Sequence, residues 1–192
     1  MSENAQNTPL YPTAGERADA ALHFEVQQFY IDEAEVLDES RFSEWFDMLA
    51  DDLDYWMPRQ TNRTRRQQAL SVHARGEVCF YDETKSSLEW RIRRFDSGAA
   101  WSEDPPSRTR HFVTNVAVRH VVVDDSSGFT TDDLVVRSNL LVYRSRLERE
   151  ENLYSGKRTD VLRRTAGGLK VARRTVVLDI HTLQAKNLST FF

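Results

Sequence analysis

Cysteine is almost absent from this 192-residue sequence, in which Cys79 is the only one. A single thiol cannot form an intramolecular disulfide, so a secreted scaffold held together by disulfides is excluded. The neighbours Val78, Phe80 and Tyr81 are apolar or aromatic, and this setting is typical of a small core residue rather than of a nucleophile. We therefore expect a cytoplasmic protein whose cysteine is structural.

Long hydrophobic runs are absent too. A membrane-spanning helix needs roughly 18 or more consecutive apolar residues, and no stretch of the chain approaches that length. The N-terminal segment MSENAQNTPLYPTAGER carries acids and amides, where a signal peptide has a basic start and an apolar core. The sequence therefore predicts no membrane partner and no secretion signal.

Neither sign of charge dominates. Lys and Arg number 26, Asp and Glu number 30, and the net charge is -4, so we expect no nucleic-acid partner. The arginine-rich run Arg59–Arg66 has no interleaved aromatics for base stacking, and we interpret it as a solvated or interface loop. Only four of the basic residues are lysines. An excess of arginine is typical of subunit interfaces and equally of a GC-rich genome, and the sequence leaves both explanations open.

Motifs for nucleophilic, phosphate-binding and metal chemistry are missing. The chain has no G-x-S-x-G motif, no glycine-rich phosphate loop and no histidine pair at the helical i, i+4 spacing. His111 and His120 lie nine residues apart on one expected strand, so we expect them to face opposite sides of it. The acids of Asp51–Asp54 lack the ligand spacing and the glycine of a calcium loop. The sequence therefore predicts no metal site.

Three segments have the apolar spacing of amphipathic helices. The first covers Ala18–Asp38 and carries acids opposite its apolar face, and the second covers Phe42–Leu49. The third follows Asp82–Thr84, which supply acids and a capping residue, and its apolar face consists of Leu88, Ile92 and Phe95. Between the second and third helices, Leu53–Met57 is typical of a strand that ends at a proline.

From Arg110 onward the pattern changes to the alternation of strands. Four long strands are predicted: Arg110–Val123, Leu134–Leu147, Asn152–Arg164 and Leu169–Leu183. Consecutive long strands form an antiparallel meander that must twist and curl. The predicted fold class is α+β, a curved antiparallel sheet (a half-barrel or cone) covered by three helices. We expect one such domain, residues 17–192, after a flexible N-terminal tail, residues 1–16.

One run of sixteen residues, WSEDPPSRTRHFVTNV (Trp101–Val116), carries a specific resemblance. In order and spacing it resembles the small (beta) subunits of bacterial aromatic-ring-hydroxylating dioxygenases. The likeness is strongest to the branch that oxidises biphenyl, benzene, toluene and cumene, and it extends more loosely from Ala18 to Phe192. It implies the fold of nuclear transport factor 2 (NTF2), cystatin-like proteins and ketosteroid isomerase.

The resemblance also implies a role. Such a chain is a noncatalytic subunit, and a large alpha oxygenase subunit carries a Rieske [2Fe–2S] cluster and a mononuclear Fe(II). Three alpha and three beta subunits assemble, and electrons from NADH pass through a reductase and a ferredoxin. O2 is then added to an arene, here a biphenyl-like one, to give a cis-dihydrodiol. No catalytic, cofactor-binding or metal-binding residue carries over to this chain. Its single cysteine cannot supply the two that a Rieske cluster requires.

Two short segments are candidates for contact with other subunits. The first is the loop with Trp101, Pro105, Pro106 and Arg108, in which two prolines fix the backbone and Trp and Arg are frequent interface anchors. This loop is expected either to dock on another subunit or to close the mouth of the cone. The second is the terminal pair Phe191-Phe192, because two terminal phenylalanines are most simply explained by docking on a surface.

A stand-alone isomerase or dehydratase of the same fold is the main alternative, and a pure binding module is another. Relatives of this fold use acids, histidines and tyrosines inside the cone. This chain offers five such residues: Tyr30, Asp38, Asp54, Tyr55 and His111. It also offers large side chains that can fill the cone: Trp45, Phe46, Trp56, Phe95 and Trp101. We expect a filled cone rather than a working pocket.

Overall fold

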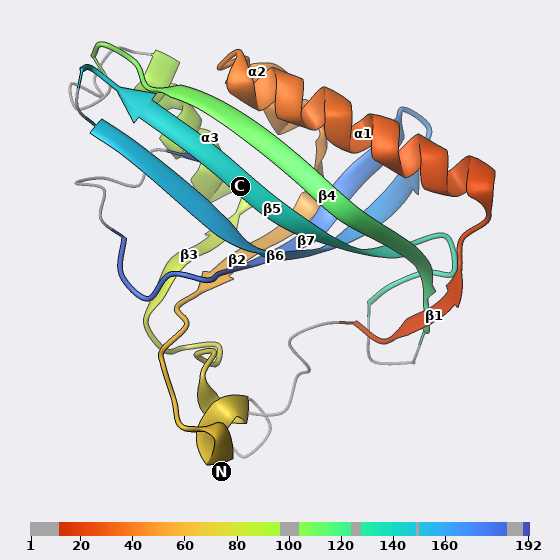
Figure 1. The fold of residues 1–192 in the computed structure, drawn as a ribbon. Helices are drawn as coiled ribbons and strands as arrows, with labels where there is room; N and C mark the ends of the chain where they lie inside the picture. The colour runs from red at the N-terminus through yellow and green to blue at the C-terminus, as the bar shows by residue number, and fades with distance from the viewer. Residues whose placement is uncertain (1–11, 97–103, 124–127, 149, 184–189) are drawn as a thin grey trace.

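The computed structural model describes residues 12–96, 104–123, 128–148, 150–183 and 190–192. Its helices are α1 (Ala20–Asp38), α2 (Phe42–Asp47) and α3 (Lys85–Asp96), with a 3-10 helix at Arg65–Leu70. Its strands are β1 (Ala14–Arg17), β2 (Leu49–Pro58), β3 (Cys79–Thr84), β4 (Arg108–Val121), β5 (Leu134–Arg146), β6 (Glu150–Thr165) and β7 (Gly168–Leu178). They form one curved, seven-stranded sheet in the order β1-β4-β5-β6-β7-β2-β3, with the α-helices gathered on one face (Figure 1).

The predicted fold class is confirmed, and its centre is the four-stranded meander. Strands β4, β5, β6 and β7 pair with their sequence neighbours, all antiparallel. Along β5 the even-numbered residues Leu134 to Arg144 are buried toward the helices, and the odd-numbered ones from Arg137 onward face outward. This alternation gives the sheet an inner face that packs on the core and an outer face that carries polar and arginine side chains.

Helix α1 covers the inner face of the sheet along β4. Asp19 caps its start by accepting a hydrogen bond from the Leu22 amide at 2.8 Å, a standard N-cap. The buried stripe of the helix includes Val26, Tyr30 and Leu37, as the spacing predicts, but also Glu33. The sequence pattern assigns this acid to no interior position, and its partners explain why it is buried.

Three strand assignments differ from expectation. Strand β2 runs parallel to β7 and antiparallel to β3, so the sheet is not wholly antiparallel. Asp82–Thr84 belong to β3, where they pair with β2, rather than only preceding a helix. Strand β1 takes in residues 14–16 of the predicted tail, because they pair with the far end of β4. These pairings join segments far apart in the sequence, so local periodicity does not reveal them.

A bulge in β4 corrects the predicted orientation of two histidines. The β4–β5 register shifts by one residue between Thr114 and Ala117, and Asn115 there has φ 54°. His111 lies opposite Val142 and His120 opposite Leu134, positions eight residues apart on β5. The two histidines therefore face the same side of the sheet, not opposite sides. About 27 Å of strand separates them at ~3.4 Å per residue, which is too far for a shared metal ion.

Within the part of the chain that the structure describes, no helix combines the length and the apolar character that a membrane span requires.

Candidate functional site

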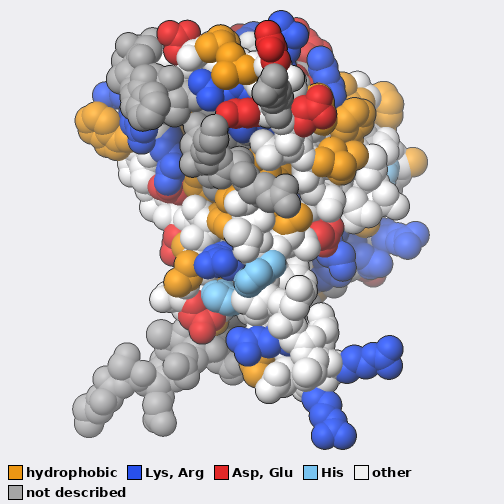
Figure 2. Space-filling model, turned by 60° about the vertical axis from the view of Figure 1, so that its left-hand side comes forward, with side chains coloured by type: hydrophobic (Ala, Val, Ile, Leu, Met, Phe, Trp, Pro, Cys, Tyr) orange, Lys and Arg blue, Asp and Glu red, His pale blue; other side chains and the backbone are white. Residues whose placement is uncertain are grey.

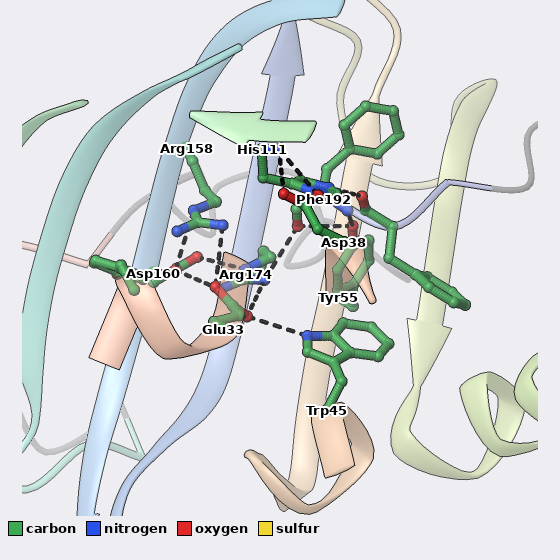
Figure 3. Close-up of polar contacts among 11 residues, drawn as sticks. Glu33, Asp38, Trp45, Tyr55, His111, Arg158, Asp160, Arg174 and Phe192 are labelled. Atoms are coloured by element: carbon green, nitrogen blue, oxygen red, sulfur yellow. Dashed lines mark hydrogen bonds and ion pairs between the residues drawn. The ribbon is translucent and has the colours of Figure 1, made fainter. Parts of the chain in front are cut away.

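A cavity of about 580 Å³, lined in part by Tyr30, Asp38 and His111, lies between α1 and β4, and the centre of the cone beside it is filled by side chains. Large residues from every layer meet there, including Trp45 of α2, Tyr55 of β2 and Tyr154 of β6, each no more than 2% exposed. Charged residues lie among them, which is unusual because a buried charge must be paired to be tolerated. Figure 3 shows these polar residues converging from α1, α2 and the strands of the sheet.

Arg174 of β7 is the centre of this polar core, and it is fully buried. Its guanidinium forms a fork with Asp160 (Nε to Oδ1 3.0 Å, Nη2 to Oδ2 2.8 Å) and a second fork with Glu33 (Nη1 to Oε1 2.7 Å, Nη2 to Oε2 3.0 Å). Nη1 also donates to the main-chain oxygen of Phe192 at 3.1 Å. These bonds use all five N–H groups of the guanidinium. With residues 190–192 in place, Arg174 therefore has no donor left for another molecule.

A second buried arginine balances the charge of the cluster. Arg158 of β6 lies 3.2 Å from Glu33 and 3.4 Å from Asp160, and its guanidinium lies 4.5 Å from the centre of the Tyr30 ring. The Tyr30 hydroxyl in turn donates to Asp160 at 2.9 Å. Two arginines and two carboxylates give a net charge of zero, which is the arrangement that makes buried ions tolerable.

The electrostatics of the cluster favour the ionised carboxylate. Burial by itself raises the pKa of Glu33, but the charges of Arg174 and Arg158 and hydrogen bonds from Arg174 and Trp45 outweigh it and lower the pKa from 4.5 to about 2. Burial lowers the pKa of Arg174, yet Asp160 and Glu33 raise it well above the ordinary arginine value. Both groups therefore stay charged at neutral pH and serve as partners for one another rather than as an acid or base.

Four of the five pocket candidates do come together at the cone. Burial raises the pKa of Tyr30, which binds the ionic cluster, well above its ordinary value and that of Tyr55 to about 12, so neither ionises near neutrality. Asp38 accepts from the main-chain and ring nitrogens of His111, the ring Nδ1 at 2.6 Å. The other ring nitrogen of His111 lies 3.0 Å from the Phe191 oxygen. Asp54 lies elsewhere, in an ion pair with Arg75.

The terminal phenylalanines lie in this interior as well. Phe191 is 2% exposed and Phe192 is fully buried, so both side chains pack within their own chain and have no surface to present to a partner. The expected contact with another subunit is thus replaced by an internal one, because the aromatic walls of the cone bury both rings. Of the proposed filling residues, Trp45 stacks on Phe191 at 4.5 Å. Trp56 lies instead under Arg75, at 4.5 Å.

The candidate docking loop is exposed where the structure describes it. Pro105, Pro106 and Arg108 are exposed, and Trp101 lies outside the described residues. Arg146 at the end of β5 holds the loop by donating to the main-chain oxygen of Pro105 at 3.1 Å and of Asp104 at 3.4 Å. The loop is therefore fixed to the end of the meander, and its prolines and Arg108 remain accessible to another protein.

Next to this loop, the outer sheet face carries a patch of large side chains. Arg110, Tyr143 and Leu153 form one row across β4, β5 and β6. On β4, Arg108 lies two residues before Arg110 and Phe112 two residues after it, on the same face of the sheet. We name these five residues the outer patch. All are exposed, Phe112 at 48% and Leu153 at 60%, and aromatic and arginine residues of this kind are enriched at interfaces.

Figure 2 shows exposed hydrophobic side chains interspersed with arginines, lysines and acids over the upper part of the face that it presents.

Helix α3 contributes an exposed tryptophan to the surface of the molecule. Trp90 is 68% exposed, and the Arg93 guanidinium lies 5.3 Å from the centre of its ring. A large exposed aromatic beside an arginine is a candidate interface anchor, and the sequence analysis did not single it out.

Comparison with known proteins agrees with this architecture. The family described as "Ring hydroxylating beta subunit" matches residues 32–185. The biphenyl 2,3-dioxygenase subunit beta of Rhodococcus jostii is 39% identical over 194 residues, which cover all of both chains. The chain belongs to the ring-hydroxylating beta subunit family. The predicted resemblance is therefore confirmed, and the protein is part of the aromatic-ring-hydroxylating dioxygenases.

Other beta subunits are equally similar in sequence. The chlorobenzene dioxygenase subunit beta of Cupriavidus sp. strain PS12 and a benzene 1,2-dioxygenase subunit beta of Pseudomonas putida are each 39% identical, over 89% of both chains. A solved structure of naphthalene 1,2-dioxygenase with indole bound has the same fold, with a TM-score of 0.78 and 23% identity, and covers 93% of this chain and 90% of that one. Equal identity to three differently named relatives does not single out one arene.

In this beta subunit, the described residues contain no group of three or more His, Cys, Asp or Glu side chains placed to hold a metal ion. The only cysteine, Cys79, is half-buried on β3, and burial raises the pKa of its thiol. The residues of the chain do not fit a Rieske cluster, which needs two cysteines and two histidines. Among the described residues, the features that stand out are the paired charges of the interior and the exposed outer patch.

Proposed function

We propose that this chain is the noncatalytic structural subunit of its dioxygenase and acts by binding a large alpha oxygenase subunit. The observation that supports the proposal most directly is the state of the cone. Its Arg174 has all five donors bound internally, and Glu33 and Asp160 are paired with arginines. A catalytic pocket needs an acid or base facing open space, whereas these groups face one another.

The reaction follows from the family rather than from this chain. The alpha subunit would carry the Rieske [2Fe–2S] cluster and the mononuclear Fe(II). Electrons from NADH would reach it through a reductase and a ferredoxin, and both atoms of O2 would enter a biphenyl-like arene as a cis-dihydrodiol. Sequence identity does not separate the arenes, and a biphenyl-like arene is proposed because the biphenyl 2,3-dioxygenase subunit beta matches this chain over its whole length. The complex would contain three alpha and three beta chains and would work in the cytoplasm.

The proposed contacts with other subunits lie on the outer patch and on the adjoining loop. Trp101, Pro105, Pro106 and Arg108 of the loop are the primary candidates, and the rigidity that its prolines impose leaves little ordering entropy to lose on binding. Tyr143 and Leu153 extend the same surface across the meander. Such a surface has an apolar centre and a charged rim, as protein interfaces have.

Co-expression tests the proposal. The chain is expressed alone and together with an alpha oxygenase subunit, and each product is examined by native mass spectrometry, iron analysis and turnover of biphenyl. We expect the isolated chain to be colourless, iron-free and inactive, and the mixture to contain both chains and to form a dihydrodiol. A chain that turns over a substrate by itself would support the isomerase or dehydratase alternative instead.

A further inference from the structure

Residues 190–192 are bound in the cone by side chains of four strands. The Tyr81 hydroxyl of β3 donates to the Thr190 oxygen at 3.2 Å, and Nε2 of His111 on β4 lies 3.0 Å from the Phe191 oxygen. Three consecutive main-chain oxygens are thus each paired with a side chain, since that of Phe192 is bound as well. A chain segment held in this way resembles a bound peptide more than a strand of the sheet.

Phe192 is held from two sides. Its main-chain oxygen accepts from the Tyr55 hydroxyl of β2 and from Arg174 of β7, both at 3.1 Å. Its amide donates to the same Tyr55 hydroxyl at 3.0 Å. Figure 3 shows Phe192 beside His111, Tyr55 and Arg174. These donors are buried, so each would be left unsatisfied if residues 190–192 were withdrawn.

The two phenyl rings occupy separate aromatic compartments. Phe191 stacks on Trp45 at 4.5 Å and meets Phe42 and Phe95 edge-on, at 5.6 and 6.0 Å. Phe192 meets Tyr154 edge-on at 5.4 Å. Apolar walls with a few convergent polar groups are the usual composition of a ligand pocket. The walls come from α2, α3 and β6, which also contact other helices and strands of the chain.

We propose that the cone is a peptide-binding pocket whose resident ligand is Thr190-Phe191-Phe192, and that the emptied pocket binds a separate peptide with the same pair of aromatic residues. The chemical class is set by the site: two adjacent aromatic rings, and carbonyl oxygens spaced to meet His111, Tyr55 and Arg174. This inference goes beyond the structural role proposed above, because it assigns a binding site inside the subunit. It also explains why the polar core contains donors directed at a main-chain oxygen.

A truncated chain ending at residue 189 provides the first test. N-acetyl-Thr-Phe-Phe is added at increasing concentration while the melting temperature is recorded, with N-acetyl-Thr-Ala-Ala as the matched control. We expect a saturable rise of about 5 °C at roughly 100 times the Kd, and at least tenfold weaker binding of the control peptide. A folded truncated chain whose melting temperature is the same with both peptides would overturn the proposal.

A second form of the protein covers the case in which the truncated chain does not fold. A protease site placed within residues 184–189 is cleaved after the intact chain has folded, so the pocket is already formed. The released tripeptide should stay bound through gel filtration and exchange with added N-acetyl-Thr-Phe-Phe. Loss of the fragment with no change in melting temperature would contradict a binding pocket.

Tyr55→Phe separates the polar contacts from the aromatic ones. This change keeps the ring and removes the hydroxyl that binds both the amide and the oxygen of Phe192. In the cleaved protein we expect this substitution to weaken the binding of added N-acetyl-Thr-Phe-Phe at least fivefold. An unchanged affinity would mean that the rings alone hold residues 190–192, and the assigned carbonyl recognition would be wrong.

Discussion

Arginines inside the cone and arginines on the outer sheet face show two uses of one residue type. Arg174 and Arg158 are fully or almost fully buried, and the carboxylates Glu33 and Asp160 meet them. Arg108 and Arg110 are exposed near aromatic side chains of the outer patch, and Arg110 also forms an ion pair with Asp38 of α1 at 3.3 Å. The two interior arginines are buried against carboxylates of their own chain, whereas the two outer ones are mostly exposed to solvent. This difference is the basis for proposing that the surface of the subunit binds other chains, while the interior cluster stabilises the fold.

The largest expected effect comes from opening the interior cluster. Arg174→Met leaves Glu33 and Asp160 buried without their main partner, and breaking a buried ion pair from one side costs about 3–5 kcal/mol of the free energy of unfolding. Urea denaturation of the purified chain measures it. A loss below about 1 kcal/mol would mean that the cluster is not a structural centre.

The interior cluster should also make stability depend on acid. The pKa of Glu33 is lowered to about 2 in the folded chain from 4.5, so its ionised form stabilises the fold above pH 4.5, and this contribution is lost as the pH falls toward 2. The shift corresponds to about 3 kcal/mol at most. The free energy of unfolding measured from pH 6 to pH 2 should decline less steeply in Glu33→Gln. Equal slopes in the two proteins would contradict the assignment.

Substitutions on the outer face should weaken assembly and leave the stability of the chain unchanged. Replacing Arg108 and Tyr143 by Ala together is expected to weaken assembly with the alpha subunit by about 2 kcal/mol, roughly thirtyfold in Kd, and to leave the thermal melt unchanged. Trp101→Ala tests the adjoining loop in the same assay. Gln67→Ala, at an exposed position of the 3-10 helix, is the control. A falling melt with unchanged assembly would assign these residues to the fold of the chain.

The smallest effect is expected for an exposed ion pair. Arg164 forms a fork with Glu25 at 2.9 and 2.8 Å, but both side chains are nearly half exposed. Exposed pairs contribute about 0–1 kcal/mol, so Arg164→Met should change urea stability far less than Arg174→Met does. Similar losses in the two variants would remove the distinction between the interior and the surface.

Much of this architecture follows from sequence patterns. Alternation locates the four long strands, and the i, i+4 spacing of Leu88 and Ile92 locates α3. The alternation of β4 does not reveal the bulge that turns His111 and His120 to one side, because an extra residue is defined only against the paired strand. The parallel β2–β7 pair is likewise a contact between distant segments.

The polar core is the part that sequence reasoning missed. Glu33 lies in a helix rich in acids, and nothing in its spacing separates it from exposed neighbours such as Asp32 and Glu35. Only the position of Arg174, 141 residues later, makes it an interior residue. Trp90 is the reverse case, an exposed residue that the sequence does not reveal as exposed. A tryptophan in an amphipathic helix is usually assumed to be buried.

The central claim is that this beta subunit contributes surface and stability but no catalytic group, and one measurement tests it most directly. The alpha subunit is co-expressed with the wild-type chain, with Glu33→Gln, and with the Arg108→Ala/Tyr143→Ala pair, and dihydrodiol formation is measured per assembled complex. We predict equal turnover per complex in all three, with fewer complexes for the surface variant. A large loss of turnover per complex in Glu33→Gln, with assembly intact, would show that the interior takes part in the chemistry.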